Sequence, residues 1–199
     1  MKPAELRAAI VTTAQAAGRS GLTPGSSGNV SARIDGGMLI TPTATKYERL
    51  TPAAIVEMRA DGTVVGNGLP SSEAPFHLAI YRARPEANAI VHAHSPFATV
   101  LACARMEIPA FHYMVAVAGA DRILCAPYAT FGTPELANNA VMALMSRKAC
   151  LLANHGQIAI GDTLDAAYDL AWEVETLAAQ YWRVLQIGGP KLLDADEMG

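Results

Sequence analysis

The sequence lacks several features that would assign it directly to a class of protein. No apolar run approaches the ~18 residues that a membrane-spanning helix needs, and Glu5 and Arg7 interrupt the segment where a secretory signal would be continuously apolar. Lys and Arg are dispersed and the formal net charge is −3, so a nucleic-acid partner is not expected. We therefore expect a cytoplasmic protein that binds neither nucleic acid nor membranes.

Cysteines and charged residues are also few. Cys103, Cys125 and Cys150 are widely spaced in apolar contexts, which fits neither a C-x-x-C metal site nor a disulfide framework. We expect all three to be reduced packing residues. Charged residues make up 17% of the chain and hydrophobic residues 51%, a balance that favours burial of some surface in an oligomer. At 199 residues the chain is expected to form one domain, 1–199.

Hydrophobic periodicity and turn residues predict helices interleaved with hairpins. The expected helices are an amphipathic opening helix within 1–21, then 74–84, 96–104, 134–147 and 163–186. The expected strands are 29–34, 38–43, 55–59, 63–66, 89–94, 123–126, 149–153 and 158–160, whereas 108–118 fits neither pattern. This order predicts an α/β architecture, a mixed or mostly antiparallel sheet covered by helices.

Two histidines, His92 and His94, stand two residues apart in the apolar run AIVHAHSP. Alternate residues of a strand point to the same face, so the two imidazoles should lie side by side. A buried histidine is often an ordinary hydrogen-bonded part of a core. Two adjacent imidazoles are most readily stabilised by a shared cation. The pattern alone leaves both interpretations open.

A third histidine, His155, is expected where a strand turns beside Gly156, at the end of the sheet. Three histidine ligands with an open fourth position are typical of a catalytic zinc site. We interpret His77 as a structural histidine of its helix. For His112 the sequence leaves a structural and a functional role open.

Glu73 follows two serines at the start of a predicted helix. A carboxylate is favourable there for capping and dipole reasons alone. The alternative is a general acid/base that also approaches the metal. Three polar loops, SSGN (26–29), TPTA (41–44) and PSSE (70–73), offer hydroxyl and backbone N–H groups of the kind that bind phosphate. Each alone is an ordinary turn, but together they favour a phosphorylated substrate.

Seven motifs resemble, in order, those of the class II aldolase/adducin family: GSSGNVSARI, GMLITPT, LPSSE, AIVHAHS, HYMVAVAG, CAPYATFGT and LLANHG. The resemblance covers nearly the whole chain and is closest to the L-fuculose-1-phosphate aldolases. It implies a three-layer α/β/α sandwich around a mostly antiparallel central sheet. It also implies a zinc-dependent lyase that cleaves a ketose 1-phosphate, such as L-fuculose 1-phosphate or a related deoxy-sugar phosphate, to dihydroxyacetone phosphate and an aldehyde.

The same resemblance implies roles for individual residues. His92, His94 and His155 would bind Zn²⁺, and Glu73 would be the catalytic acid/base that also approaches the metal. Tyr113 matches a catalytic tyrosine that similar enzymes supply from a neighbouring subunit of a homotetramer. The positions that match phosphate-binding residues are Ser26, Gly28, Asn29, Thr43, Ala44, Ser71 and Ser72.

The chain departs from the fuculose-type pattern at three places. Ala44 replaces a glycine, which should stiffen that phosphate loop, and Ala74 replaces a bulky aromatic residue, which should enlarge or reshape the pocket. The chain ends at LLDADEMG, so we expect most of the tail that helps to close similar sites over the aldehyde to be missing.

Several rival functions remain within the family. Pentulose-phosphate 4-epimerases are similar, but they carry an aspartate where this chain has Glu73 and an acidic residue in the segment that here reads HYMVAVAG. Decarboxylases of 3-oxo sugar acid phosphates and enzymes acting on methylthioribulose 1-phosphate or 5-deoxypentulose 1-phosphates are further alternatives. The non-enzyme alternative is an adducin-like interaction module, against which the intact histidines and Glu73 argue.

Overall fold

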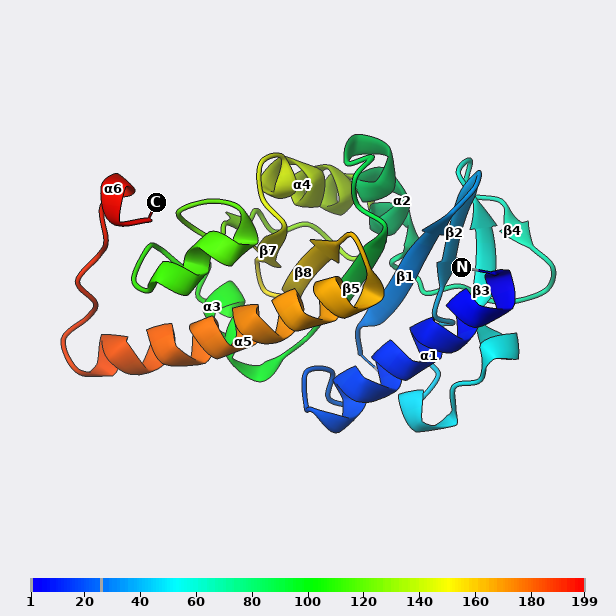
Figure 1. Cartoon of the computed structure of the whole chain (residues 1–199), viewed down its shortest axis with the longest axis horizontal. Helices are drawn as coiled ribbons and strands as arrows, with labels where there is room; N and C mark the ends of the chain where they lie inside the picture. The colour runs from blue at the N-terminus through cyan, green and yellow to red at the C-terminus, as the bar shows by residue number, and fades with distance from the viewer. Residues whose placement is uncertain (1, 26, 199) are drawn as a thin grey trace.

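A computed structural model describes residues 2–25 and 27–198, and in this part of the chain eight strands form one sheet (Figure 1). The strands are β1 (Asn29–Ile34), β2 (Gly37–Ile40), β3 (Val56–Arg59), β4 (Val64–Val65), β5 (Ala89–Ala93), β6 (Cys125–Ala126), β7 (Ala149–Leu152) and β8 (Gly156–Gly161). Their spatial order is β4-β3-β2-β1-β5-β8-β7-β6, and only the pair β6 and β7 is parallel. The central sheet is therefore mostly antiparallel, as the resemblance implied.

The helices begin where the sequence supplies capping residues. They are α1 (Pro3–Arg19), α2 (Ala74–Ala83), α3 (Pro96–Cys103), α4 (Pro134–Leu144), α5 (Leu164–Gln186) and α6 (Ala195–Met198), with 3-10 turns at Tyr47–Arg49, Pro52–Ala54 and Tyr113–Ala118. A proline stands in the first turn of α1 to α4, where its missing N–H costs nothing. The side chains of Thr133 and Thr163 accept hydrogen bonds from the first turns of α4 and α5.

Side chains on the two faces of the sheet belong to two separate cores. In β5, Ala89, Val91 and Ala93 pack in the core that contains α1, α3 and α5, whereas Ile90 packs in the core that contains α2 and α4. Figure 1 shows α1 and α5 on one side of the sheet and α2 and α4 on the other. The fold is thus a three-layer α/β/α sandwich, which confirms the prediction.

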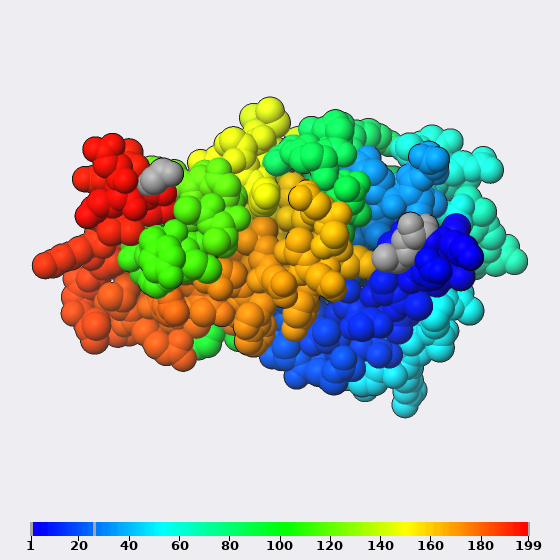
Figure 2. Space-filling view, in the orientation of Figure 1, coloured from blue at the N-terminus to red at the C-terminus, as the bar shows by residue number. Residues whose placement is uncertain are grey.

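The long helix α5 spans the middle of one face of the molecule, between α1 and the C-terminal segment (Figure 2). Its buried residues follow the stripe that the 3.6-residue period predicts, among them Ala167, Ala171, Val174 and Ala178. Among the helices of residues 2–25 and 27–198, none combines the length and apolarity that crossing a bilayer requires.

Some predicted boundaries were wrong. The strand predicted at 158–160 already begins at Gly156, because a glycine there lets β8 approach β5: a Cβ atom would lie 2.4 Å from the carbonyl oxygen of Ala93. The ambiguous segment 108–118 divides into a bridge between Ile108 and Ile123 and a 3-10 turn. Cys103, predicted to be a packing residue, is exposed at the C-terminal end of α3.

Candidate active site

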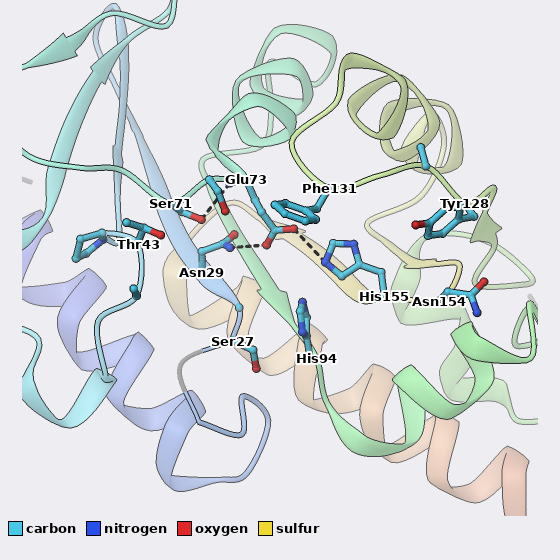
Figure 3. A pocket seen from close by; sticks show the side chains of 15 residues that line it. Ser27, Asn29, Thr43, Ser71, Glu73, His94, Tyr128, Phe131, Asn154 and His155 are labelled. Carbon is cyan, nitrogen blue, oxygen red and sulfur yellow. Dashed lines mark hydrogen bonds and ion pairs between the residues drawn. The ribbon is translucent and has the colours of Figure 1, made fainter.

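Four side chains from separate parts of the chain converge at one end of the sheet, and Figure 3 shows three of them, Glu73, His94 and His155. Glu73 immediately precedes α2, His92 lies in β5, His94 follows it, and His155 lies in the turn between β7 and β8. One ligating atom from each lies within 4.8 Å of the others. The Nε2 atoms of His92 and His94 are 3.0 Å apart, and the Glu73 carboxylate lies 3.1 Å from His92 Nε2 and 3.0 Å from His155 Nε2.

The three imidazoles are arranged around a common point rather than stacked. Their ring centroids are 4.7 to 4.9 Å apart and each pair of rings is inclined by 75 to 77°. His92 Nδ1 donates a hydrogen bond to the carbonyl oxygen of Gln157 at 2.8 Å. This bond directs the lone pair of His92 Nε2 toward the other rings, as in the outer shell of many metal sites.

The electrostatics of the cluster favour an ionised Glu73 carboxylate beside a neutral His94 imidazole. Burial alone would raise the pKa of Glu73, but the adjacent His92 and His155 outweigh burial and hold that pKa well below its ordinary value. Burial, with the neighbouring imidazoles of His92 and His155, lowers the pKa of His94 to about 4. Neutral imidazole and carboxylate are the protonation states that metal binding requires.

The donor set fits a divalent metal ion. Three imidazole nitrogens and one carboxylate are ligands typical of zinc and similar ions. Glu73 Oε1 is buried and makes no hydrogen bond of regular geometry among the described residues, although His155 Nε2 lies 3.0 Å away, and a bound cation would satisfy both atoms. The Glu73 side chain makes no capping hydrogen bond to α2, although its residue is the N-cap. The cluster can therefore hold a divalent cation, and helix capping does not explain Glu73.

A pocket of about 380 Å³ opens onto this cluster. Its lining combines Glu73, His94 and His155 with the three polar loops of the sequence, which meet at one wall (Figure 3). The residues predicted to bind phosphate that line it are Gly28, Asn29, Thr43, Ala44, Ser71 and Ser72. Ser71 Oγ accepts a hydrogen bond from the backbone N–H of Glu73 at 3.2 Å, which links this wall directly to the cluster.

Two backbone positions shape the loops at the pocket wall. Gly28 has φ of +86°, and a Cβ atom there would lie 2.6 Å from the carbonyl oxygen of His92, so only glycine lets the loop approach β5. Ala44 also adopts a left-handed conformation, with φ of 51°. The replacement of glycine by alanine noted in the sequence therefore falls on a residue whose backbone conformation favours glycine.

Some predicted site residues lie elsewhere. Ser26 lies outside the residues that the structure describes. His92 is fully buried beneath the pocket and does not line it. Tyr113 is 64% exposed and does not line the pocket of its own chain. Ala74 is 2% exposed, belongs to the core around α2 and does not line the pocket, so the expectation that it enlarges or reshapes the pocket stays a prediction.

Sequence reasoning missed the wall that faces the phosphate loops. Tyr128, Phe131 and Asn154 line this part of the pocket, and the two aromatic side chains are largely exposed (Figure 3). Tyr128 and Phe131 lie in the CAPYATFGT motif, which was a signal for the family but carried no predicted role. Asn154 adjoins His155 and has a positive φ of 57°.

The two remaining histidines have clear contacts. His77 is fully buried and is hydrogen-bonded to Ser31 Oγ at 2.7 Å and to Asn29 Oδ1 at 2.5 Å, and burial lowers its pKa to about 3. These contacts confirm that it is a hydrogen-bonded residue of the interior. His112 Nδ1 accepts a hydrogen bond from the backbone N–H of Met114, which caps the 3-10 turn.

Comparisons with known proteins agree with this site. The family model described as Class II Aldolase and Adducin N-terminal domain matches residues 8–182. The 5-methylthioribulose-1-phosphate/5-deoxyribulose-1-phosphate aldolase of Rhodospirillum rubrum is 51% identical over 97% of this chain and 87% of its own. The L-fuculose phosphate aldolase of Escherichia coli (strain K12) is 47% identical over 99% of this chain and 92% of its own.

The fold comparison leads to the same group. A solved structure of L-fuculose 1-phosphate aldolase superposes with a TM-score of 0.94 at 41% identity and covers 98% of this chain and 92% of its own. These relatives are named as aldolases, which are lyases, so the predicted resemblance to a lyase of the fuculose-phosphate aldolase type is confirmed. The chain belongs to the class II aldolase and adducin family.

Proposed function

We propose that this chain is a zinc-dependent aldolase that cleaves a ketose 1-phosphate to dihydroxyacetone phosphate and an aldehyde. The observation that carries the proposal is the convergence of Glu73, His92, His94 and His155 on a single pocket. The opposite wall of that pocket consists of the polar loops that favour a phosphorylated substrate. The names of the similar relatives, aldolases of sugar 1-phosphates, support the same reaction.

The phosphate group would bind at the loops around Gly28, Thr43 and Ser72. None of the described residues that line the pocket is Lys or Arg, so hydroxyl groups and backbone N–H groups would supply the hydrogen bonds. Asn29, Ala44 and Ser71 complete this proposed set, and Ser26 stays a prediction. This arrangement places the sugar carbons between the phosphate loops and the metal cluster.

Glu73 is the proposed proton donor. When a divalent ion is bound, it supplies Lewis-acid stabilisation of the negative charge that develops as the C3–C4 bond breaks. The proton of the C4 hydroxyl leaves as the aldehyde forms, and C3 of the enediolate must then be protonated to give dihydroxyacetone phosphate. The Glu73 carboxylate lines the pocket, where it would first take up a proton from solvent, then deliver that proton to C3 and return to its ionised form.

Tyr113 is the proposed acceptor of the C4 hydroxyl proton, acting from a neighbouring subunit; it would accept that proton as its own hydroxyl proton passes to solvent. Its exposure and its position outside the pocket of its own chain support a contribution between subunits. A complete site would then require a homo-oligomer, for which we propose a homotetramer. The proposed location remains the cytoplasm.

The substrate candidates share the phosphate end and differ at the aldehyde end. They are L-fuculose 1-phosphate, 5-deoxyribulose 1-phosphate and 5-methylthioribulose 1-phosphate, whose aldehyde ends carry a methyl or methylthio group. Tyr128 and Phe131 line the pocket and provide apolar surface for such an end. A panel of these three compounds, assayed for release of dihydroxyacetone phosphate, tests the proposal. Absence of release from all three would refute it.

Two measurements separate the proposed function from its rivals. A Glu73→Gln variant should keep its metal and its fold but lose ~10²–10⁴-fold in cleavage rate, the usual contribution of a general acid/base. Undiminished turnover would remove Glu73 from the mechanism. A 4-epimerase would interconvert pentulose phosphates without releasing dihydroxyacetone phosphate, and a decarboxylase would release carbon dioxide. An adducin-like module would bind no stoichiometric metal.

A further inference from the structure

We propose that a buried hydrogen-bond chain from Tyr81 through Ser31, His77 and Asn29 orients the Glu73 carboxylate, with His77 as the positioning residue. The inference rests on the proposed role of Glu73 and adds to it three residues that lie behind the pocket. None of Ser31, His77 and Tyr81 lines the pocket or belongs to the metal cluster. They would therefore act on the reaction only through Asn29 and Glu73.

The chain is continuous and fully enclosed. Tyr81 Oη lies 2.8 Å from Ser31 Oγ, which lies 2.7 Å from His77 Nδ1. His77 Nε2 lies 2.5 Å from Asn29 Oδ1, and Asn29 Nδ2 lies 2.8 Å from Glu73 Oε2, the bond drawn in Figure 3. All five residues are buried, with exposed fractions of 7% or less. Ser31, His77 and Tyr81 lie behind the pocket, whereas Asn29 and Glu73 also line it.

Secondary structure places these residues opposite one another. Glu73, His77 and Tyr81 stand four residues apart at the start of and along α2, so they share one face of the helix. Asn29 and Ser31 stand two apart in β1, so they share one face of the strand. The helical stripe spans about 12 Å, the rise of eight helical residues, and its side chains reach the two strand residues, which stand about 7 Å apart.

The chemistry of the groups fixes the direction of every hydrogen bond. An ionised carboxylate only accepts, so the Asn29 amide must direct Nδ2 toward Glu73 and Oδ1 toward His77. His77 must then donate from Nε2, which leaves its Nδ1 as an acceptor for the Ser31 hydroxyl hydrogen. Ser31 Oγ in turn accepts from Tyr81. Each donor along the chain therefore points toward Glu73.

This direction explains what His77 contributes. When His77 carries its proton on Nε2, an Asn29 amide rotated by 180° would direct its N–H groups at the His77 N–H and its oxygen at the Glu73 carboxylate, and both contacts would be repulsive. Asn29 selects the Nε2–H tautomer, because the other tautomer would place a lone pair of Nε2 against Asn29 Oδ1, and Ser31, which accepts from Tyr81, supports it by donating to the free Nδ1. The network thus holds Glu73 Oε2 in one orientation relative to the pocket.

The test uses the metal-loaded protein and dihydroxyacetone phosphate alone in deuterated water. Exchange of its C3 proton for deuterium, followed by NMR, reports the proton transfer proposed for Glu73 without any aldehyde. We expect His77→Leu to lower the exchange rate about 10–100-fold with unchanged KM and metal content, the usual effect of an outer-shell partner. His77→Gln, which can still donate at the same position, should recover most of the rate. Ser31→Ala and Tyr81→Phe should give smaller losses, and Tyr168→Phe on α5 is the matched control with no expected loss.

Three results would overturn the proposal. The first is an exchange rate in His77→Leu within twofold of the unmodified protein. The second is a rate loss that metal loss fully accounts for, and the third is equal rates in Tyr81→Phe and Tyr168→Phe. If the unmodified protein itself exchanges no proton, the proposed function fails instead, and the network is tested by ¹⁵N NMR of the His77 ring. The Nε2–H tautomer is expected there, and the Nδ1–H tautomer would refute the network in either case.

Discussion

Replacement of Ala44 by glycine should stabilise the protein. Ala44 has φ of 51°, in the left-handed region that costs an L-residue roughly 1–2 kcal/mol and glycine almost nothing. Its side chain is exposed, so removal of the methyl group loses little packing. Glycine increases the entropy of the unfolded chain, an opposing effect of about 0.4–1 kcal/mol. We therefore expect the free energy of unfolding to rise by about 0.5–1 kcal/mol in Ala44→Gly.

Urea denaturation of Ala44→Gly and of Ala104→Gly measures this difference. Ala104 is also exposed and ends a helix, but its φ of −80° is ordinary for alanine. Only the entropic effect operates there, so Ala104→Gly should lower the free energy of unfolding by about 0.4–1 kcal/mol. The free energy of unfolding should thus rise in Ala44→Gly and fall in Ala104→Gly, and its slope against urea concentration should be the same in both variants. If Ala44→Gly destabilises the protein as much as Ala104→Gly does, the left-handed conformation is not costly and the reasoning is refuted.

Three further predictions concern buried polar contacts. Glu175 accepts hydrogen bonds at 2.8 Å from two backbone N–H groups at the start of α3. Glu175→Ala should therefore lower the free energy of unfolding by about 2–3 kcal/mol, and Glu175→Gln should lower it clearly less. Equal losses in the two variants would contradict this. Arg84 donates to the carbonyl oxygens of Leu144 and Arg147 at the end of α4, and Arg84→Met, which keeps the apolar stem, should cost about 1.5–3 kcal/mol by thermal denaturation. Burial lowers the pKa of His77 to about 3 in the folded state, whereas the unfolded state binds this proton near pH 6.5. The free energy of unfolding should therefore fall as the pH drops below about 6.5. Between pH 6 and 4 this proton accounts for up to ~1.4 kcal/mol of unfolding free energy per pH unit, and His77→Gln should lack that contribution. Identical pH profiles of stability for His77→Gln and the unmodified protein would exclude the effect.

The metal cluster was largely predictable because its signals are local in the sequence. Period-two spacing puts His92 and His94 on one strand face, and a turn glycine puts His155 at the end of the sheet. The structure brings these residues to Glu73 in the expected way. Pairing of β8 with β5 brings His155 beside His92 and His94, and the start of α2 supplies Glu73.

The parts that could not be predicted depend on contacts between distant elements. His77 was expected to be structural, but its bonds to β1 appear only once α2 is docked on the sheet. The orientation of Ala74 into the core depends on the same docking, and the sequence pattern instead suggested the pocket. Tyr128 and Phe131 lie in an irregular loop, where no periodicity indicates which side chains face a cavity.

Titration of the metal-free protein with Zn²⁺ tests the central claim most directly. The account predicts one high-affinity ion for each chain of the unmodified protein, and a marked loss of bound zinc in His155→Ala, whose Nε2 lies 3.0 Å from the Glu73 carboxylate. Full occupancy in His155→Ala, or the absence of stoichiometric binding in the unmodified protein, would contradict it.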